Sequence, residues 1–213
     1  MVDTAERYRL ARERVTAIVE TLDGDEVARP VPTCPGWTVH DLVAHLSGLV
    51  DDVLAGRLEG RGTPPWTAAQ VERGRGVPVE ELLAAWSKQA ASFEQLRVPA
   101  RVVIDIVTHE QDLRGAVERP GARDTEELAW AFDLGAQSAV GEVAGLRIET
   151  AEGPAYGPTD AATTLVGDRF ELFRVFLGRR SAAQLQRLDW RNGMPPDAGK
   201  IMVFGPATVD IRE

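Results

Sequence analysis

The chain has 213 residues, of which 44% are hydrophobic and 27% are charged, and its 24 basic and 33 acidic residues give a formal net charge of −9. These proportions are typical of a globular protein with one large domain or two small ones. An acidic chain without a run of Lys or Arg argues against nucleic-acid binding, which requires a basic face. Its single cysteine, Cys34, excludes an intramolecular disulfide framework.

Signals for secretion or membrane insertion are missing from the sequence. Residues 1–7 (MVDTAER) lack the apolar core of a signal peptide. No apolar run reaches the roughly 18–20 residues that a membrane span requires. We therefore expect a cytoplasmic protein in a reducing compartment that has no membrane partner.

The first 120 residues carry the spacing of amphipathic helices. Apolar side chains that recur every three to four residues predict helices at positions 4–22, 38–55, 79–96 and 100–119. Residues 56–78 are rich in Gly, Pro and Arg and are predicted to form a long connection. Four such helices suggest an antiparallel bundle.

The second helix has a recognisable start. Residues 29–37 (RPVPTCPGW) contain three prolines and a glycine, which predicts an ordered or extended loop. Thr38 then begins the helix, and Asp41 three residues later is a shorter counterpart of the Glu of a capping box. Trp37, just before this start, is predicted to be a hydrophobic staple.

The pattern changes near residue 145. Before this point, a fifth helix is predicted at 125–143; after it, the sequence predicts a strand at 146–150, a helix at 168–177, and closing strands at 201–204 and 207–211. We therefore predict two domains, a helical one at 1–143 and a small α/β one at 144–213.

The helix at 100–119 carries the first candidate site. At about 100° per residue, Asp105, His109 and Asp112 lie within about 60° of one another, beside the apolar stripe of the helix. A carboxylate and an imidazole that point the same way can be two ligands of one metal ion. The same pattern is also typical of a solvated polar edge with hydrogen bonds between residues four apart.

His45 is the third candidate ligand. It lies on the shoulder of the buried face of the second helix, so it would face Asp105 and His109 if the second and fourth helices are neighbours. Two histidines and one carboxylate fit catalytic zinc, and also non-haem iron or nickel. The alternative is a hydrogen-bonded core histidine. His40 lies in the first turn of its helix and is predicted to be a surface or capping-region residue.

Three motifs resemble one family. The segments 31–46 (VPTCPGWTVHDLVAHL), 105–113 (Asp105-x-x-x-His109-x-x-Asp112-Leu113) and 177–181 (LGRRS) are similar, in this order, to motifs of the mycothiol-dependent maleylpyruvate isomerase family. The resemblance implies a mainly α fold, in which a DinB-like antiparallel four-helix bundle is followed by a small α/β C-terminal domain.

The resemblance also implies a metal site. Family members bind a divalent metal, typically zinc, through a His on the second helix and a Glu-x-x-x-His on the fourth, which correspond here to His45, Asp105 and His109. The Asp at position 105, where the family often has Glu, is one methylene shorter. Asp112 would either orient His109 as a hydrogen-bond partner or be a surface carboxylate. Cys34 is predicted to be a packing residue, and the alternative is a reactive thiol near the site.

Arg179 and Arg180 are the candidate catalytic residues of the C-terminal motif. A guanidinium can bind a substrate carboxylate through two parallel hydrogen bonds. The resemblance implies that one of the two contacts the thiol cofactor or the substrate, and we take Arg180 to be the cofactor-binding residue. The alternative is that both are solvated arginines near a helix end.

The function that the resemblance implies is a zinc- and mycothiol-dependent isomerase or thiol S-transferase, with a small-molecule thiol and an electrophile as partners. We expect a monomer or a homodimer. The alternative is a metal-binding or ligand-sensing protein without catalytic activity.

Overall fold

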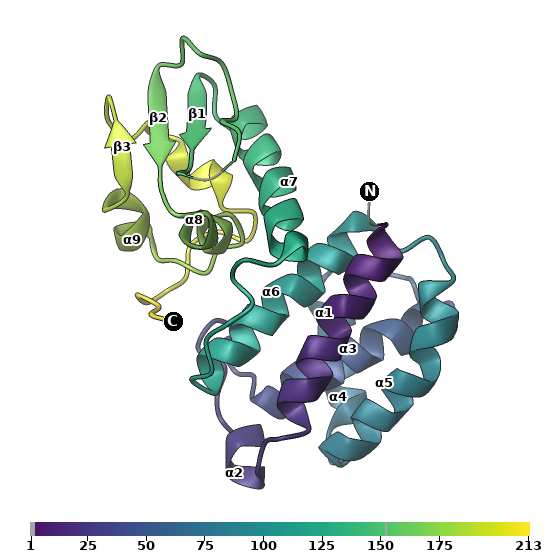
Figure 1. Cartoon of the computed structure of the whole chain (residues 1–213). Coiled ribbons are helices and arrows are strands. Elements are labelled where there is room, and N and C mark those ends of the chain that lie inside the picture. Colours follow the sequence, from purple (N-terminus) through teal and green to yellow (C-terminus); the bar gives the residue numbers. More distant parts are fainter. Residues whose placement is uncertain (1–2, 152) are drawn as a thin grey trace. The chain divides into compact units, whose positions relative to one another are not determined.

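The computed structural model describes residues 3–151 and 153–213 and divides into two compact units, residues 1–121 and residues 122–213 (Figure 1). The described helices of the first unit are α1 (Thr4–Val19), α2 (Gly24–Val27), α3 (Val39–Leu54), α4 (Pro64–Gly74), α5 (Val79–Glu94) and α6 (Ala100–Ala116).

The first unit is a helical bundle. Helix α3 packs against α4, α5 and α6, and α1 packs against α5 and α6. Apolar side chains of α1, α3, α5 and α6 are buried between the helices, and the indole nitrogen of Trp86 donates a 2.9 Å hydrogen bond to the hydroxyl of Tyr8 inside this core. This arrangement confirms the predicted fold class of the N-terminal part.

Helix α3 begins as predicted. The side chain of Thr38 accepts a hydrogen bond from the backbone nitrogen of Asp41, and the carboxylate of Asp41 accepts one from the backbone nitrogen of Thr38. This reciprocal capping box satisfies backbone donors at the helix start. It fixes the helix two turns before His45, which is 3% exposed.

The connection predicted at 56–78 is wrong over residues 64–74, because these residues form α4. Two prolines occupy its first turn, where the missing N–H donors cost nothing. A Cβ at Gly74 would overlap the Cβ of Ala44, and one at Gly48 would lie 2.9 Å from the Cβ of Gln70. Both glycines therefore allow α4 to pack very close to α3.

The second unit combines helices with a small mixed sheet. Its described elements are α7 (Glu126–Glu142), β1 (Leu146–Glu149), β2 (Thr163–Val166), α8 (Arg169–Phe176), α9 (Ala182–Gln186), β3 (Asp189–Arg191) and the 3₁₀ helix η1 (Ala198–Ile201). Strand β1 pairs parallel with β2, and β2 pairs antiparallel with β3. Helix α7 packs against α8, β1 and η1. The predicted small α/β unit is confirmed.

The closing strands predicted at 201–204 and 207–211 are wrong. Ile201 ends η1, and Ala207 makes only an isolated bridge with Ser181. A strand with one buried face buries every second residue, whereas Ile201 and Met202 are both buried and the next two residues are both exposed. The third strand of the sheet is β3 instead.

The division into units places α7 with the sheet. The sequence pattern places the domain boundary between 143 and 144, where the helices give way to β1, whereas the packing places it between 121 and 122. None of the helices in the described parts of the chain has the length and apolar character of a membrane-spanning helix.

Candidate metal centre

The three predicted ligands come together within the first unit. His45 is supplied by α3, and Asp105 and His109 by successive turns of α6. The Nε2 of His45 lies 3.3 Å from Oδ2 of Asp105, and the Nε2 of His109 lies 3.6 Å from Oδ1 of the same carboxylate. One ligand atom from each residue lies within 4.8 Å of the others, as in a site that can hold one metal ion.

The two imidazoles are held on their other side as well. The Nδ1 of His109 donates a hydrogen bond to Oδ2 of Asp112 at 2.9 Å, and Asp112 is only 1% exposed. Of the two roles considered for Asp112, the geometry fits the one that orients His109 and not the surface carboxylate. A carboxylate behind a ligating histidine fixes its tautomer and makes it a stronger donor.

Gln70 plays the corresponding part for His45. Its Oε1 lies 2.7 Å from Nδ1 of His45, and its Nε2 donates a 2.9 Å hydrogen bond to Oδ2 of Asp52. Because an ionised carboxylate only accepts hydrogen bonds, Asp52 fixes which end of the Gln70 amide faces the histidine. The Nδ1 of His45 therefore carries the proton that Oε1 accepts.

This hydrogen bonding leaves both Nε2 atoms directed at Asp105. In a neutral imidazole with its proton on Nδ1, Nε2 carries a lone pair, and two such lone pairs face a carboxylate here. Electron pairs facing one another require a proton or a cation between them. Two imidazole nitrogens and a carboxylate oxygen are ligands that zinc and other divalent transition metals accept, so the residues fit a metal ion.

The electrostatics of His45 agree with this arrangement. Burial lowers the pKa of His45, but the negative charge of Asp105 and the hydrogen bonds to Asp105 and Gln70 raise it, and the net direction is upward. The surroundings of this imidazole therefore favour positive charge at the point where the ligand atoms converge.

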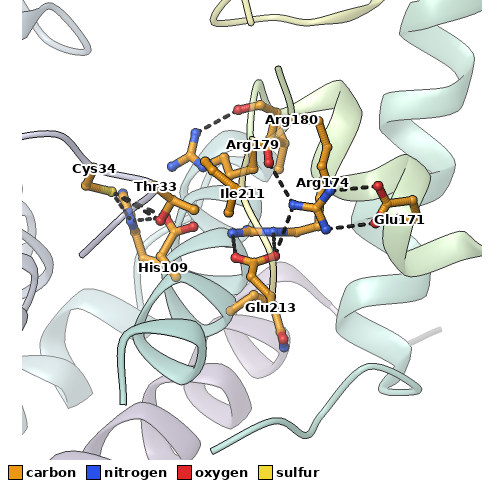
Figure 2. Close-up of polar contacts among 12 residues, drawn as sticks. Thr33, Cys34, His109, Glu171, Arg174, Arg179, Arg180, Ile211 and Glu213 are labelled. Atoms are coloured by element: carbon orange, nitrogen blue, oxygen red, sulfur yellow. Dashed lines mark hydrogen bonds and ion pairs between the residues drawn. The ribbon is translucent and has the colours of Figure 1, made fainter. Parts of the chain in front are cut away.

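A second group of potential ligands shares His109. The Sγ of Cys34 lies 3.9 Å from Nδ1 of His109 (Figure 2). The same sulfur lies 3.5 Å from Oδ2 of Asp112. In this group, a metal ion would need the same Nδ1 that donates to Asp112 at 2.9 Å. The short hydrogen bond favours the group built on His45, Asp105 and His109. Cys34, predicted to be a packing residue, lies at the edge of the His109–Asp112 pair.

Trp37 contacts the candidate site, whereas His40 lies outside the ligand group, where the sequence also placed it. The ring of Trp37, expected to be a staple, lies 5.2 Å from that of His45 and 5.9 Å from that of His109, measured between centroids. It is half-buried and packs against both imidazoles. His40 is outside the group, and its Nε2 donates a 2.8 Å hydrogen bond to the carbonyl of Val77.

Arg179 and Arg180 belong to the second unit, where both are buried. The guanidinium of Arg180 donates to Glu171 at 2.7 Å and to Glu213 at 3.2 Å (Figure 2). Arg179 donates to the carbonyl of Leu177 at 2.7 Å. Within its unit, Arg180 thus already binds two carboxylates, and the contacts of both arginines with a substrate or thiol remain a prediction.

The sequence pattern did not indicate a role for Gln70 or Asp52. Gln70 lies in the segment that was predicted to be a connection, and nothing in the sequence links Asp52, on α3, to the proposed ligands. The signal that could have found α4 is Thr63 followed by Pro64 and Pro65, which is a typical helix start.

Part of the chain matches a known family and its relatives. The profile of the family described as Mycothiol maleylpyruvate isomerase N-terminal domain matches residues 8–101. An uncharacterized protein found in two strains of Mycobacterium tuberculosis is 27% identical over 135 residues, which cover 59% of this chain and 73% of the relative. The matched profile includes His45 and Gln70 and ends before Asp105.

Two solved structures have a similar fold. A crystal structure of the mycothiol-dependent maleylpyruvate isomerase aligns with a TM-score of 0.56 and 14% identity, and a histidine-to-alanine mutant of that enzyme aligns with a TM-score of 0.62 and 15% identity. Each alignment covers 90% of this chain and 93% of the other. Residues 8–101 thus match the profile of the mycothiol maleylpyruvate isomerase N-terminal domain family, and the chain as a whole has a fold similar to that of the solved isomerase.

Proposed function

We propose that this protein binds a divalent metal ion, with zinc the first candidate, through His45, Asp105 and His109. We further propose that it uses the ion in a reaction of a low-molecular-weight thiol, with mycothiol the first candidate, as an isomerase or an S-transferase. The observation that carries the proposal is the convergence of two imidazole Nε2 atoms on the carboxylate of Asp105, while each Nδ1 donates to a buried acceptor.

Each residue of the site has a role in this proposal. The two histidines and Asp105 supply three protein ligands, which is the number found in catalytic zinc sites that keep a position for substrate. Asp112 and Gln70 hold the imidazoles in the required tautomer. The indole of Trp37 covers the two rings and limits their contact with water. An ion held by His45, Asp105 and His109 would supply Lewis acidity, which would lower the pKa of a coordinated thiol.

The thiol dependence rests on similarity. The solved structures of similar fold are titled as a mycothiol-dependent maleylpyruvate isomerase, and fold alone does not choose between isomerisation and thiol transfer. Both reactions would begin with a thiolate attacking an electrophilic carbon. The difference lies in whether the thiol leaves again or remains bound to the product.

The test starts from metal content. Purified protein, stripped with a chelator and reloaded with zinc, should bind one ion per chain, and His45→Ala should lose it while the matched control His40→Ala keeps it. The loaded protein is then assayed with mycothiol, using maleylpyruvate for isomerisation and monobromobimane for conjugation. Metal-dependent turnover of either substrate is the expected result.

Two outcomes would contradict the proposal in different ways. Wild-type protein that binds no stoichiometric metal would remove the site itself. Protein that binds zinc but neither binds mycothiol nor converts either electrophile would leave a metal-binding protein without the proposed catalysis. The short side chain of Asp105 is the reason to test for this second outcome. If it occurs, the variant Asp105→Glu carries the residue that the family often has at this position, and its activity shows whether the shorter side chain abolished the catalysis.

A further inference from the structure

We infer that Gln70 is a positioning residue of the metal site, which fixes the tautomer and orientation of His45 through a hydrogen-bonded chain that ends at Asp52. This inference deepens the proposed function and rests on its metal site. It also assigns a role to α4, the helix that brings Gln70 to the interior of the first unit.

The hydrogen bonds that link His45, Gln70 and Asp52 have a fixed order of donors and acceptors. Nδ1 of His45 donates to Oε1 of Gln70 at 2.7 Å, and Nε2 of Gln70 donates to Oδ2 of Asp52 at 2.9 Å. All three side chains are at most 3% exposed, so water does not compete for these groups. An amide placed between a donor and an ionised carboxylate has only one orientation that satisfies both of its ends.

Asp52 is itself anchored. Its Oδ1 accepts hydrogen bonds from Arg73 at 2.5 Å and from Arg57 at 2.7 Å, while its Oδ2 accepts the one from Gln70. Burial raises the pKa of this carboxyl, but the hydrogen bonds, the one from Arg73 foremost, lower it to below the ordinary value. Asp52 is therefore ionised at neutral pH and keeps the amide of Gln70 in its orientation.

The backbone is shaped to place Gln70 at this point. A Cβ at Gly48 would come within 2.9 Å of the Cβ of Gln70, and a Cβ at Gly74 would overlap that of Ala44. The two helices thus lie closer than side chains at these positions would permit. This close packing leaves the Gln70 side chain little freedom to move away from His45.

The consequence for metal binding follows from the imidazole tautomer. With its proton on Nδ1, His45 presents the lone pair of Nε2 toward Asp105. Without the acceptor at Gln70, the proton can move to Nε2, where it blocks coordination, or the ring can rotate. Loss of such an outer hydrogen-bond partner typically weakens metal binding by about 10–100-fold.

The experiment measures zinc affinity by competition with a chromophoric chelator, without any thiol or substrate. The variants are Gln70→Met, which keeps the length and packing of the side chain and removes both hydrogen bonds, and Gln70→Ala. The matched control is Gln89→Met, because the amide of Gln89 also donates to a carboxylate on α3, that of Asp51 at 3.0 Å, and takes no part in the chain that reaches His45. We expect about 10–100-fold weaker binding in both Gln70 variants and unchanged binding in the control.

A second measurement separates positioning from general loosening. The chain has only three histidines, so nitrogen-15 NMR of the metal-free protein can report the tautomer of each ring before a bound ion fixes it. The expected result is a fixed Nδ1–H tautomer for His45 in the wild type and a mixture in Gln70→Met, with His40 unchanged. Wild-type affinity and a fixed tautomer in Gln70→Met would overturn the inference, whereas absence of zinc binding in the wild type would overturn the proposed function instead.

Discussion

Asp112 and His109 lie three residues apart on α6, and the carboxylate of Asp112 accepts the Nδ1 proton of His109 at 2.9 Å, with the side chain of Asp112 fully buried. His45 has a neutral amide in the same place. A carboxylate partner makes an imidazole a stronger electron donor than an amide partner does. The two histidines of the candidate site are therefore not equivalent, and His109 would be the stronger ligand of a bound ion.

This difference predicts the effect of Asp112→Asn. The substitution keeps the size of the side chain but removes the negative charge behind His109, so zinc affinity is expected to fall by about 10–100-fold. Chelator competition measures the change, and Asp124→Asn, at an exposed position, is the control. Equal affinities in Asp112→Asn and wild type would show that Asp112 does not act on the metal through His109.

Cys34 allows the two potential ligand groups to be distinguished. If His45, Asp105 and His109 hold the ion, Cys34→Ser should change cobalt or zinc affinity by less than about threefold, well below the effect of losing an outer hydrogen-bond partner. Cobalt-loaded wild type should lack the intense thiolate-to-metal absorption of a coordinated cysteine. Such an absorption, lost in Cys34→Ser, would assign the ion to the group of Cys34, His109 and Asp112 instead.

Asp52 makes the free energy of unfolding of the first unit depend on pH. Its carboxyl has a pKa below the ordinary value of 3.8, and a group of this kind stabilises the fold above its ordinary pKa and loses that contribution as the pH falls through the folded value. Asp52→Asn should lower the free energy of unfolding at pH 7 by about 1–3 kcal/mol. In urea titrations of metal-free protein, this difference should stay constant down to about pH 5 and shrink below about pH 4.

The close packing of α4 on α3 predicts a steric effect at Gly74. Gly74→Ala places a methyl group against that of Ala44, and overpacking of this kind costs about 1–3 kcal/mol. Adding Ala44→Gly should recover part of the loss. A methyl group at Gly141 on α7 would meet nothing within 4 Å, so Gly141→Ala should leave thermal stability unchanged or raise it; equal melting temperatures for Gly74→Ala and wild type would contradict the packing argument.

The helices that carry the proposed ligands could be predicted because their signals are local. The capping residues Thr38 and Asp41 indicate where α3 begins. Asp105 and His109 are four residues apart, so any helix that contains both places their side chains on one face. Their meeting with His45 depends on which helices are neighbours. That relationship came from the resemblance to a family and not from the spacing.

Helix α4 could not be predicted from periodicity because its buried face is not apolar. The face is formed by Gln70, Val71 and Gly74, and only one of these three residues contributes a hydrophobic signal. A buried Gln is stable only when both ends of its amide find partners, and His45 and Asp52 come from another helix. Local sequence patterns therefore do not predict residues that support a site through hydrogen bonds to other helices.

The strands predicted at 201–204 and 207–211 failed for a different reason. β-branched and aromatic residues are typical of strands, but this preference depends on what the side chains pack against. Val203 and Phe204 are exposed, and Gly205 adopts a positive φ of 72° that turns the chain. The third strand is only three residues long, Asp189–Arg191, which is too short to show an alternating pattern.

The proposed metal ligands are divided between α3 and α6, which are far apart in the sequence, and an ion held by both would join them as a cross-link. A metal ion that binds only the folded protein, at a free concentration a thousand times its dissociation constant, stabilises the folded state by about 4 kcal/mol. Substitutions elsewhere in the bundle that cost less than this would be tolerated while metal is plentiful. In cells deprived of metal, the same substitutions would lower the amount of folded protein. The phenotype of a substitution in the core, away from the site, would therefore depend on the metal supply.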